Sequence, residues 1–324
     1  MTQSVSRRTF VASSLALALS GSLVSRALAA QDATPAASGL DSLGLPTLNI
    51  TISSSGFEGV PSSLPAGRYL VSATGNADVQ EGLAVAFVQP KGMSVDDFLN
   101  AIKSGGPASP ASGGGGGGGE GTPMSDEGES EGPPPAAFYD FLFAGGISLA
   151  PGQPNQVVLD LPAGDWVAWG DDPTSPLAPV TFTVTGEEPT DLPEPKANAT
   201  ISFSDFAINL TDGKLVSGKN IIKLENHGAQ PHFLILMKGP DGMTKDDIKT
   251  ALDVEMTGTP VAGSLSEKDL TPVLGTDTQS TGVNTWVAAD LEPGTYAGLC
   301  FFPDKETGMP HAYMGMYNVF TVGS

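Results

Sequence analysis

The second half of the sequence repeats the first, and this repeat limits the fold more than any other feature. Residues 90–97 (PKGMSVDD) match residues 240–247 (PDGMTKDD), and residues 161–166 (LPAGDW) match residues 291–296 (LEPGTY). Two further pairs of segments keep the same order, namely 66–70 with 217–221 and 181–184 with 319–322. Matches spread over so long a stretch indicate two copies of one fold.

Each copy has the pattern of a β-sandwich. Short apolar or alternating runs between Gly and Pro turns predict strands. These strands are expected at 48–52, 68–74, 83–88, 138–143, 156–161, 166–169 and 180–184, and in the second copy at 233–237, 295–299 and 317–322. One short helix is expected in each copy after the Gly-Met motif, where Ser94 and Asp97 form a capping signal. The sequence therefore predicts an all-β protein with two sandwiches.

The first thirty residues have the pattern of an export signal. Arg7 and Arg8 precede the apolar run 11–24, and the small residues of 27–29 form a cleavage site. The paired arginines, with Arg26 near the cleavage site, resemble a twin-arginine signal. A membrane anchor is the weaker interpretation, because the run is short and interrupted by Ser and Gly. We expect an exported protein that is periplasmic, attached to the cell surface or secreted, without a membrane span in the mature chain.

The remaining chain divides by composition. Residues 31–45 are expected to form a disordered tether, followed by a first domain at 46–186 and a second at 198–324. The Gly-rich stretch 104–135 cannot bury enough apolar surface to order itself, and we interpret it as a disordered insertion in the first domain. The Pro- and Glu-rich stretch 187–197 is the expected linker.

The charge of the chain excludes one class of partner. The export signal contains three arginines and no acid, so its removal takes the net charge from −21 to −24. So acidic a protein is not expected to bind nucleic acid. The charge is compatible with a redox protein or a copper donor as partner.

One cysteine, Cys300, stands alone in a chain destined for an oxidising compartment, where disulfides are the usual state of cysteines. It has two interpretations. It is either a small buried hydrophobic residue or a metal ligand whose thiolate the metal protects.

The residues around Cys300 favour the metal ligand. Cys300 ends the expected strand 295–299, and His311 and Met316 lie in the loop 310–316 before the last strand. His232 opens the expected strand 233–237, on the same face as Leu234 and Leu236 by period-2 alternation. Two imidazoles, a thiolate and a weak thioether are the donors of electron-transfer copper sites.

These segments resemble the ligand segments of cupredoxins, the plastocyanin-like blue copper proteins. Residues 226–234 (NHGAQPHFL) look like their first-ligand segment, and the Pro-His-x-x-x-Gly-Met pattern of 310–316 looks like their C-terminal ligand loop. The resemblance implies two Greek-key cupredoxin sandwiches and a one-electron carrier. It also implies one copper ion held by His232, Cys300, His311 and Met316, with His311 near the surface as the electron port.

The sequence departs from the cupredoxin pattern in one place. Ten residues separate Cys300 from His311, whereas cupredoxins place only a few there, so residues 302–309 are expected to bulge outward as an extra loop. Met309 and Met314 are then alternatives to Met316 as axial ligand.

The first copy is expected to have no ligands. Gly82 and Gly170 stand at the positions that correspond to His232 and Cys300. His227 is expected in an exposed turn as a non-ligand. Trp166 aligns with Tyr296 and is expected in the core.

Two other functions remain open at the level of sequence. The soft cluster of Met309, Met314, Met316 and Cys300 would also suit copper trafficking or sequestration. A metal-free scaffold or adhesion module is the other alternative. Multicopper oxidase and copper nitrite reductase activity are not expected, because three histidines cannot supply the additional copper centres.

Overall fold

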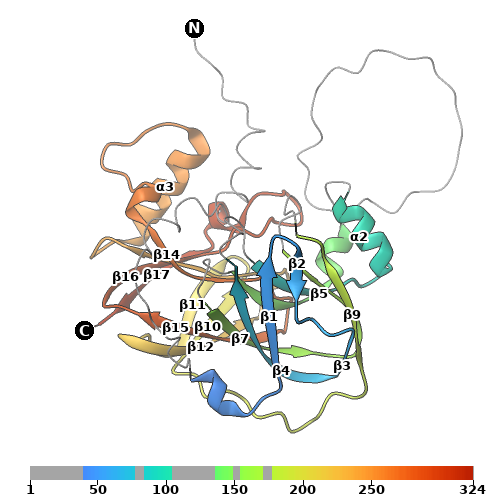
Figure 1. The fold of residues 1–324 in the computed structure, drawn as a ribbon. Coiled ribbons are helices and arrows are strands. Elements are labelled where there is room, and N and C mark those ends of the chain that lie inside the picture. The colour runs from blue at the N-terminus through green and yellow to red at the C-terminus, as the bar shows by residue number, and fades with distance from the viewer. Residues whose placement is uncertain (1–38, 77–83, 104–135, 149–153, 171–176, 324) are drawn as a thin grey trace, which may run out of the picture.

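The computed structural model describes residues 39–76, 84–103, 136–148, 154–170 and 177–323. These residues form two β-sandwiches side by side, with α2 and α3 on opposite sides of the molecule (Figure 1). The all-β fold class predicted from the sequence is confirmed.

Apart from β3, the strands of the first half recur in the same order in the second half, where an isolated bridge between Val216 and Gly323 takes the place of β3. The first sandwich contains β1 (Thr47–Ser53), β2 (Gly56–Glu58), β3 (Ser63–Pro65), β4 (Gly67–Gly75), β5 (Ala84–Gln89), β6 (Leu142–Ser148), β7 (Pro154–Leu161), β8 (Gly164–Trp169) and β9 (Val180–Thr185). The second contains β10 (Ala199–Ser204), β11 (Ala207–Gly213), β12 (Gly218–Asn226), β13 (Ile235–Gly239), β14 (Thr271–Thr276), β15 (Asn284–Leu291), β16 (Gly294–Leu299) and β17 (Tyr317–Val322).

Each half also has one α-helix, α2 (Val95–Lys103) or α3 (Lys245–Thr257). Four short 3₁₀-helices complete the described elements: η2 (Leu40–Leu43), η3 (Ala136–Asp140), η4 (Glu267–Asp269) and η5 (His311–Met314). Capping starts both α-helices where the sequence predicts it. The Ser94 side chain accepts from the Asp97 N–H at 3.1 Å, and Thr244 and Asp247 form a full capping box.

The strand pairing of one half matches that of the other. The first strand of each half, β1 or β10, pairs parallel with β4 or β12 and antiparallel with β2 or β11. The chain then crosses between the two sheets of each sandwich, as in a Greek key. The aromatic residues Trp166 and Tyr296 occupy equivalent positions in β8 and β16, both buried. Each donates a hydrogen bond to the carbonyl oxygen four residues earlier, at 2.9 Å and 2.8 Å.

Both sheets run without interruption from one sandwich into the other. β7 pairs with β15, and β6 pairs with β14, all antiparallel. Val157 lies opposite Val287, its equivalent in the repeat, so an approximate two-fold axis relates the two halves. The sandwiches therefore share backbone hydrogen bonds in both layers, and their relative position is fixed by strand pairing.

Several predicted boundaries change. Residues 138–143 were expected as one strand, but η3 covers the first of them and β6 begins at Leu142. Residues 39–45 were expected as part of a disordered tether, but η2 lies there because Leu40, fully buried, packs with Leu70, Val158 and Trp286. The predicted export signal at 1–30, the insertion at 104–135 and Gly82 lie outside the described residues. No helix in the described part of the chain has the length and apolar character needed to cross a membrane.

Candidate metal centre

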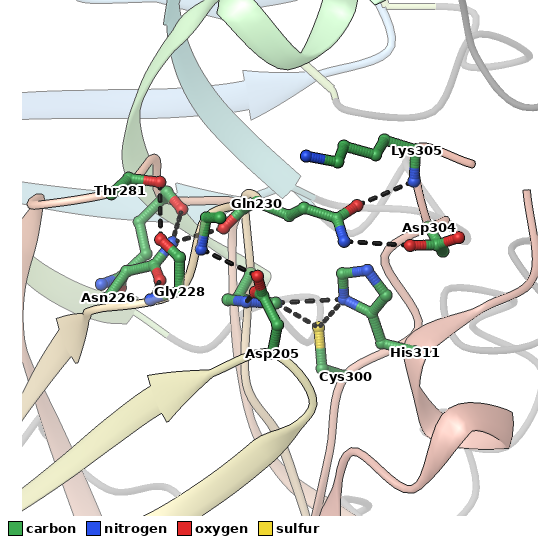
Figure 2. Close-up of polar contacts among 12 residues, drawn as sticks. Asp205, Asn226, Gly228, Gln230, Thr281, Cys300, Asp304, Lys305 and His311 are labelled. Atoms are coloured by element: carbon green, nitrogen blue, oxygen red, sulfur yellow. Dashed lines mark hydrogen bonds and ion pairs between the residues drawn. The ribbon is translucent and has the colours of Figure 1, made fainter. Parts of the chain in front are cut away.

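Three predicted ligands of the second sandwich lie together in its interior. The Nδ1 atoms of His232 and His311 are 3.0 Å apart. The Cys300 Sγ atom is 3.9 Å from the His232 Nδ1 and 3.8 Å from the His311 Nδ1. All three residues have an exposed fraction of 0%. Figure 2 shows the Cys300 sulfur directed at the His311 ring.

The spacing of these atoms fits a metal ion. The point equidistant from the three atoms lies about 2.1 Å from each, within the range of about 2.0–2.3 Å at which imidazole nitrogen and thiolate sulfur bind transition metals. Nitrogen and sulfur donors of this kind suit copper and zinc rather than hard cations such as magnesium.

Backbone hydrogen bonds hold the ligand segments together. His232 precedes β13 and exchanges two backbone hydrogen bonds with Gln279, at 3.1 Å and 2.8 Å. Cys300 follows β16, and its N–H donates to the Met316 carbonyl at 3.2 Å. The Met316 N–H in turn donates to the His311 carbonyl at 2.9 Å, across η5. The period-2 prediction for His232 is confirmed, because Leu234 and Leu236 are buried with it in the core.

Asp205 is a site residue that the sequence did not indicate. Its Oδ1 lies 2.8 Å from the His232 Nε2, and its Oδ2 accepts the Ala229 N–H at 2.9 Å. A carboxylate only accepts, so the Nε2 of His232 carries the proton and its Nδ1 presents a lone pair to the centre. Gly228 makes room for this contact, because a Cβ there would lie 2.4 Å from Asp205 Oδ1 and 2.5 Å from His232 Nε2.

Aromatic rings close the centre to water. Phe206, in the turn between β10 and β11, and Phe302 pack on the His311 ring with centroid distances of 4.7 Å and 5.8 Å. The His311 Nε2 is buried and has no hydrogen-bond partner among the described residues. The expected position of His311 near the surface is therefore wrong, because the residue is 0% exposed and these two rings pack on it. Its role as the electron port stays a prediction.

Burial sets the protonation of the donors. Burial raises the pKa of the Cys300 thiol to about 12. Burial, and secondarily the proximity of His232, lowers the pKa of His311 to about 3. Burial also lowers the pKa of His232, although the Asp205 carboxylate opposes this. At neutral pH the metal-free centre therefore contains a thiol and two neutral imidazoles, and a metal ion would displace the thiol proton.

The long loop between Cys300 and His311 is folded onto the second sandwich. Asp304 is buried and its Oδ1 accepts a hydrogen bond from the Gln230 side chain at 2.9 Å, while the Gln230 Oε1 accepts the Lys305 N–H at 2.7 Å (Figure 2). The Asp304 Oδ2 also accepts the Thr307 N–H at 2.9 Å. The predicted outward bulge is confined to the apex of the loop, because Phe302 and Asp304 point inward.

The remaining candidates differ in burial. Met316 is fully buried in the same core cluster as Cys300, whereas Met309 is 41% exposed. Met314 is half-buried and lines a hollow between α3 and η5. Burial thus favours Met316 over Met309 and Met314 as the candidate thioether ligand. The His227 side chain is 64% exposed and pairs with Glu225, in agreement with its prediction in an exposed turn. Gly170 follows β8 as Cys300 follows β16.

The solved structures that are similar to this chain include copper proteins. The chain is 19% identical to the dithionite-reduced auracyanin of Roseiflexus castenholzii over 39% of this chain and 95% of that one, with a TM-score of 0.27. Auracyanin A of Chloroflexus aurantiacus, a "blue" copper protein, is 20% identical over 38% and 96%, with a TM-score of 0.26. A copper nitrite reductase of Nitrosomonas europaea is 10% identical over 86% and 94%, with a TM-score of 0.20. No family model and no curated protein match the sequence.

The strand order of each half and the pairing of its first strand define the fold. Among the described residues, only the second half contains a group of side chains able to hold a metal. The chain consists of two β-sandwiches of matching topology, the second of which carries the candidate metal centre.

Proposed function

We propose that this chain is an exported electron carrier with one copper ion in its second sandwich. The observation that supports this most is the buried triangle of His232 Nδ1, His311 Nδ1 and Cys300 Sγ, whose spacing fits a single ion. When bound, copper would supply a one-electron couple between Cu(I) and Cu(II). Two imidazoles, a thiolate and the Met316 thioether are the donor set of type 1 copper.

The residues of the chain have distinct roles in this proposal. Cys300 would lose its proton and hold the ion as thiolate, and both imidazoles would hold it in their neutral form. Asp205 orients the His232 ring, as carboxylates commonly do for metal-bound histidine. Phe206 and Phe302 exclude water from His311. The backbone hydrogen bonds between the ligand segments limit their movement, which favours rapid electron exchange.

Full burial of the three ligands supports an electron carrier over a trafficking protein. A protein that hands copper to a partner needs ligands that the partner can reach, and here all three ligands are 0% exposed. A carrier retains its ion and exchanges only electrons. The third histidine of the chain, His227, is exposed and pairs with Glu225, so no histidine is left to hold a further copper centre. We therefore propose a carrier and not an oxidase or nitrite reductase, with a redox protein as partner outside the cytoplasm.

Copper titration of the mature protein tests this proposal. One equivalent of Cu(II) should be taken up and should produce strong visible absorption from thiolate-to-copper charge transfer. Cys300→Ser should abolish the absorption, and Met316→Leu should keep it while changing the reduction potential. His227→Ala is the matched control and should leave both unchanged. Tight uptake of Cu(I) without colour would indicate trafficking, and the absence of stoichiometric uptake would contradict copper binding altogether.

A further inference from the structure

The first sandwich contacts the long ligand loop of the second through the segment 138–143. The Phe138 ring stacks on the Phe302 ring, with centroids 5.9 Å apart and planes at 12°. The Tyr139 ring meets Phe302 edge-on at 5.8 Å, and the Tyr139 hydroxyl donates to the Pro303 carbonyl at 3.1 Å. Two rings and one hydrogen bond thus hold adjacent residues of the loop.

Phe302 connects this contact to a ligand. Its ring lies 5.8 Å from the His311 ring, and its carbonyl accepts the His311 N–H at 2.9 Å. A displacement of Phe302 would therefore move His311 or expose it. The residues that Tyr139 and Phe138 hold belong to the additional loop between Cys300 and His311.

The same segment contacts the surroundings of the other histidine. The Ser280 hydroxyl accepts the Phe143 N–H and donates to the Phe141 carbonyl, both at 2.9 Å. The neighbouring Gln279 pairs with Ala144 of the first sandwich and with His232 of the second. One segment of the first sandwich therefore lies next to the neighbours of both ligand histidines.

We propose that the first sandwich is a fixed cover of the metal centre, in which Phe138 and Tyr139 are positioning residues. They hold Phe302 and Pro303 in place, and through Phe302 they keep His311 out of water. This assigns a role to a sandwich whose described residues include no metal-binding group of their own. The metal part of the proposal rests on the proposed function, but the cover is a property of the metal-free chain.

The variant Tyr139→Phe tests the hydrogen bond and keeps the ring. In the metal-free full chain, Cys300 should react with iodoacetamide about three- to tenfold faster, as expected for a lost hydrogen bond that holds the loop closed. In the copper-loaded chain, the thiolate-to-copper band and the reduction potential should both shift. Tyr69→Phe is the matched control, because the Tyr69 hydroxyl also donates to a proline carbonyl, at Pro65 within the first sandwich. This control should change none of these quantities.

The variant Phe138→Ala tests the ring contact and should accelerate the reaction of Cys300 by about tenfold or more. Phe138→Tyr retains the ring and should restore the slow reaction. Phe57→Ala, in the edge strand β2, is the control for general loss of stability, because Phe57 is more buried than Phe138. Its Cys300 reactivity should stay slow under native conditions.

Two results would overturn the cover. The first is that Cys300 reactivity and the copper spectrum are both unchanged in the Tyr139 and Phe138 variants. The second is that the Tyr69 and Phe57 controls change these two quantities equally. Faster alkylation in the Tyr139 and Phe138 variants of a chain that takes up no copper would support the cover and contradict only the proposed function.

Discussion

Replacing Asp205 with asparagine should weaken copper binding by about 10- to 100-fold, which corresponds to about 1.4–2.7 kcal/mol. Two donors converge on the Asp205 carboxylate, the His232 Nε2–H at 2.8 Å and the Ala229 N–H at 2.9 Å, one on each oxygen. An asparagine side chain has only one acceptor oxygen. One of the two donors therefore loses its partner, and the orientation of the His232 ring or of the 228–229 turn beside it is no longer fixed.

The size of this effect follows from the surroundings of the pair. The Asp205 side chain is 24% exposed, and burial lowers the pKa of His232, so the pair at neutral pH is a carboxylate with a neutral imidazole. A hydrogen bond to a charged group contributes about 1.5–3 kcal/mol, and solvent contact places this one toward the lower end. That agrees with the range expected for a carboxylate that orients a metal-bound histidine.

The assay is an anaerobic Cu(I) competition titration against a chromophoric chelator at constant pH. Glu225→Gln is the matched control, because Glu225 contacts the exposed His227 at 3.2 Å in the same way but lies outside the centre. Its affinity should equal that of the unmodified chain. If Asp205→Asn changes the affinity by less than about twofold, or if Glu225→Gln weakens it equally, the assigned role of Asp205 is refuted.

Two further predictions concern the same centre. Gly228→Ala should weaken copper binding about tenfold or more, because the added Cβ would separate Asp205 from His232. In the same titration, the double variant with Asp205→Asn should bind copper only slightly more weakly than either single variant, because both changes break the same contact. The metal-free chain should be most stable between about pH 6.5 and 9. Below this range the histidines of the unfolded chain bind protons that the buried imidazoles do not bind, which stabilises the unfolded state. Above this range the cysteine of the unfolded chain loses its proton while the buried Cys300 keeps it, which has the same effect. Urea unfolding across pH should show both declines, and Cys300→Ser should lose the alkaline one; a flat profile would contradict the buried neutral donors.

The sequence predicted the fold because its signals are periodic and repeated. Alternation of apolar residues places His232 on the buried face with Leu234 and Leu236, and the structure confirms this. The repeat identifies equivalent positions without any contact information, as at Trp166 and Tyr296. The capping signal at Ser94 is local and starts a helix where expected, and the helix expected in the second copy begins after Thr244, at the matching position.

The contacts around the centre could not be predicted in the same way. Asp205 and Phe206 lie in a turn between β10 and β11, far from His232 and His311 in the sequence, and no local pattern connects them. The position expected for His311, near the surface, came from the family resemblance alone, which contains no information on Phe206 and Phe302, the two rings that pack on it here. The sequence did not predict η3, because the aromatic residues of this segment are also typical of a strand.

The strand pairing that connects the two sandwiches explains why the proposed cover can be permanent. Ile147 of β6 pairs with Thr276 of β14, and the same ladder continues to the pair of Ala144 and Gln279. Strand pairing thus fixes the distance from β6 to the residue that pairs with His232. Phe138 and Tyr139 lie immediately before β6, so the ladder that joins the sandwiches also sets where they meet the ligand loop. In the proposed cover, the first sandwich acts on the centre although its described residues include no metal-binding group, provided that this ladder remains paired.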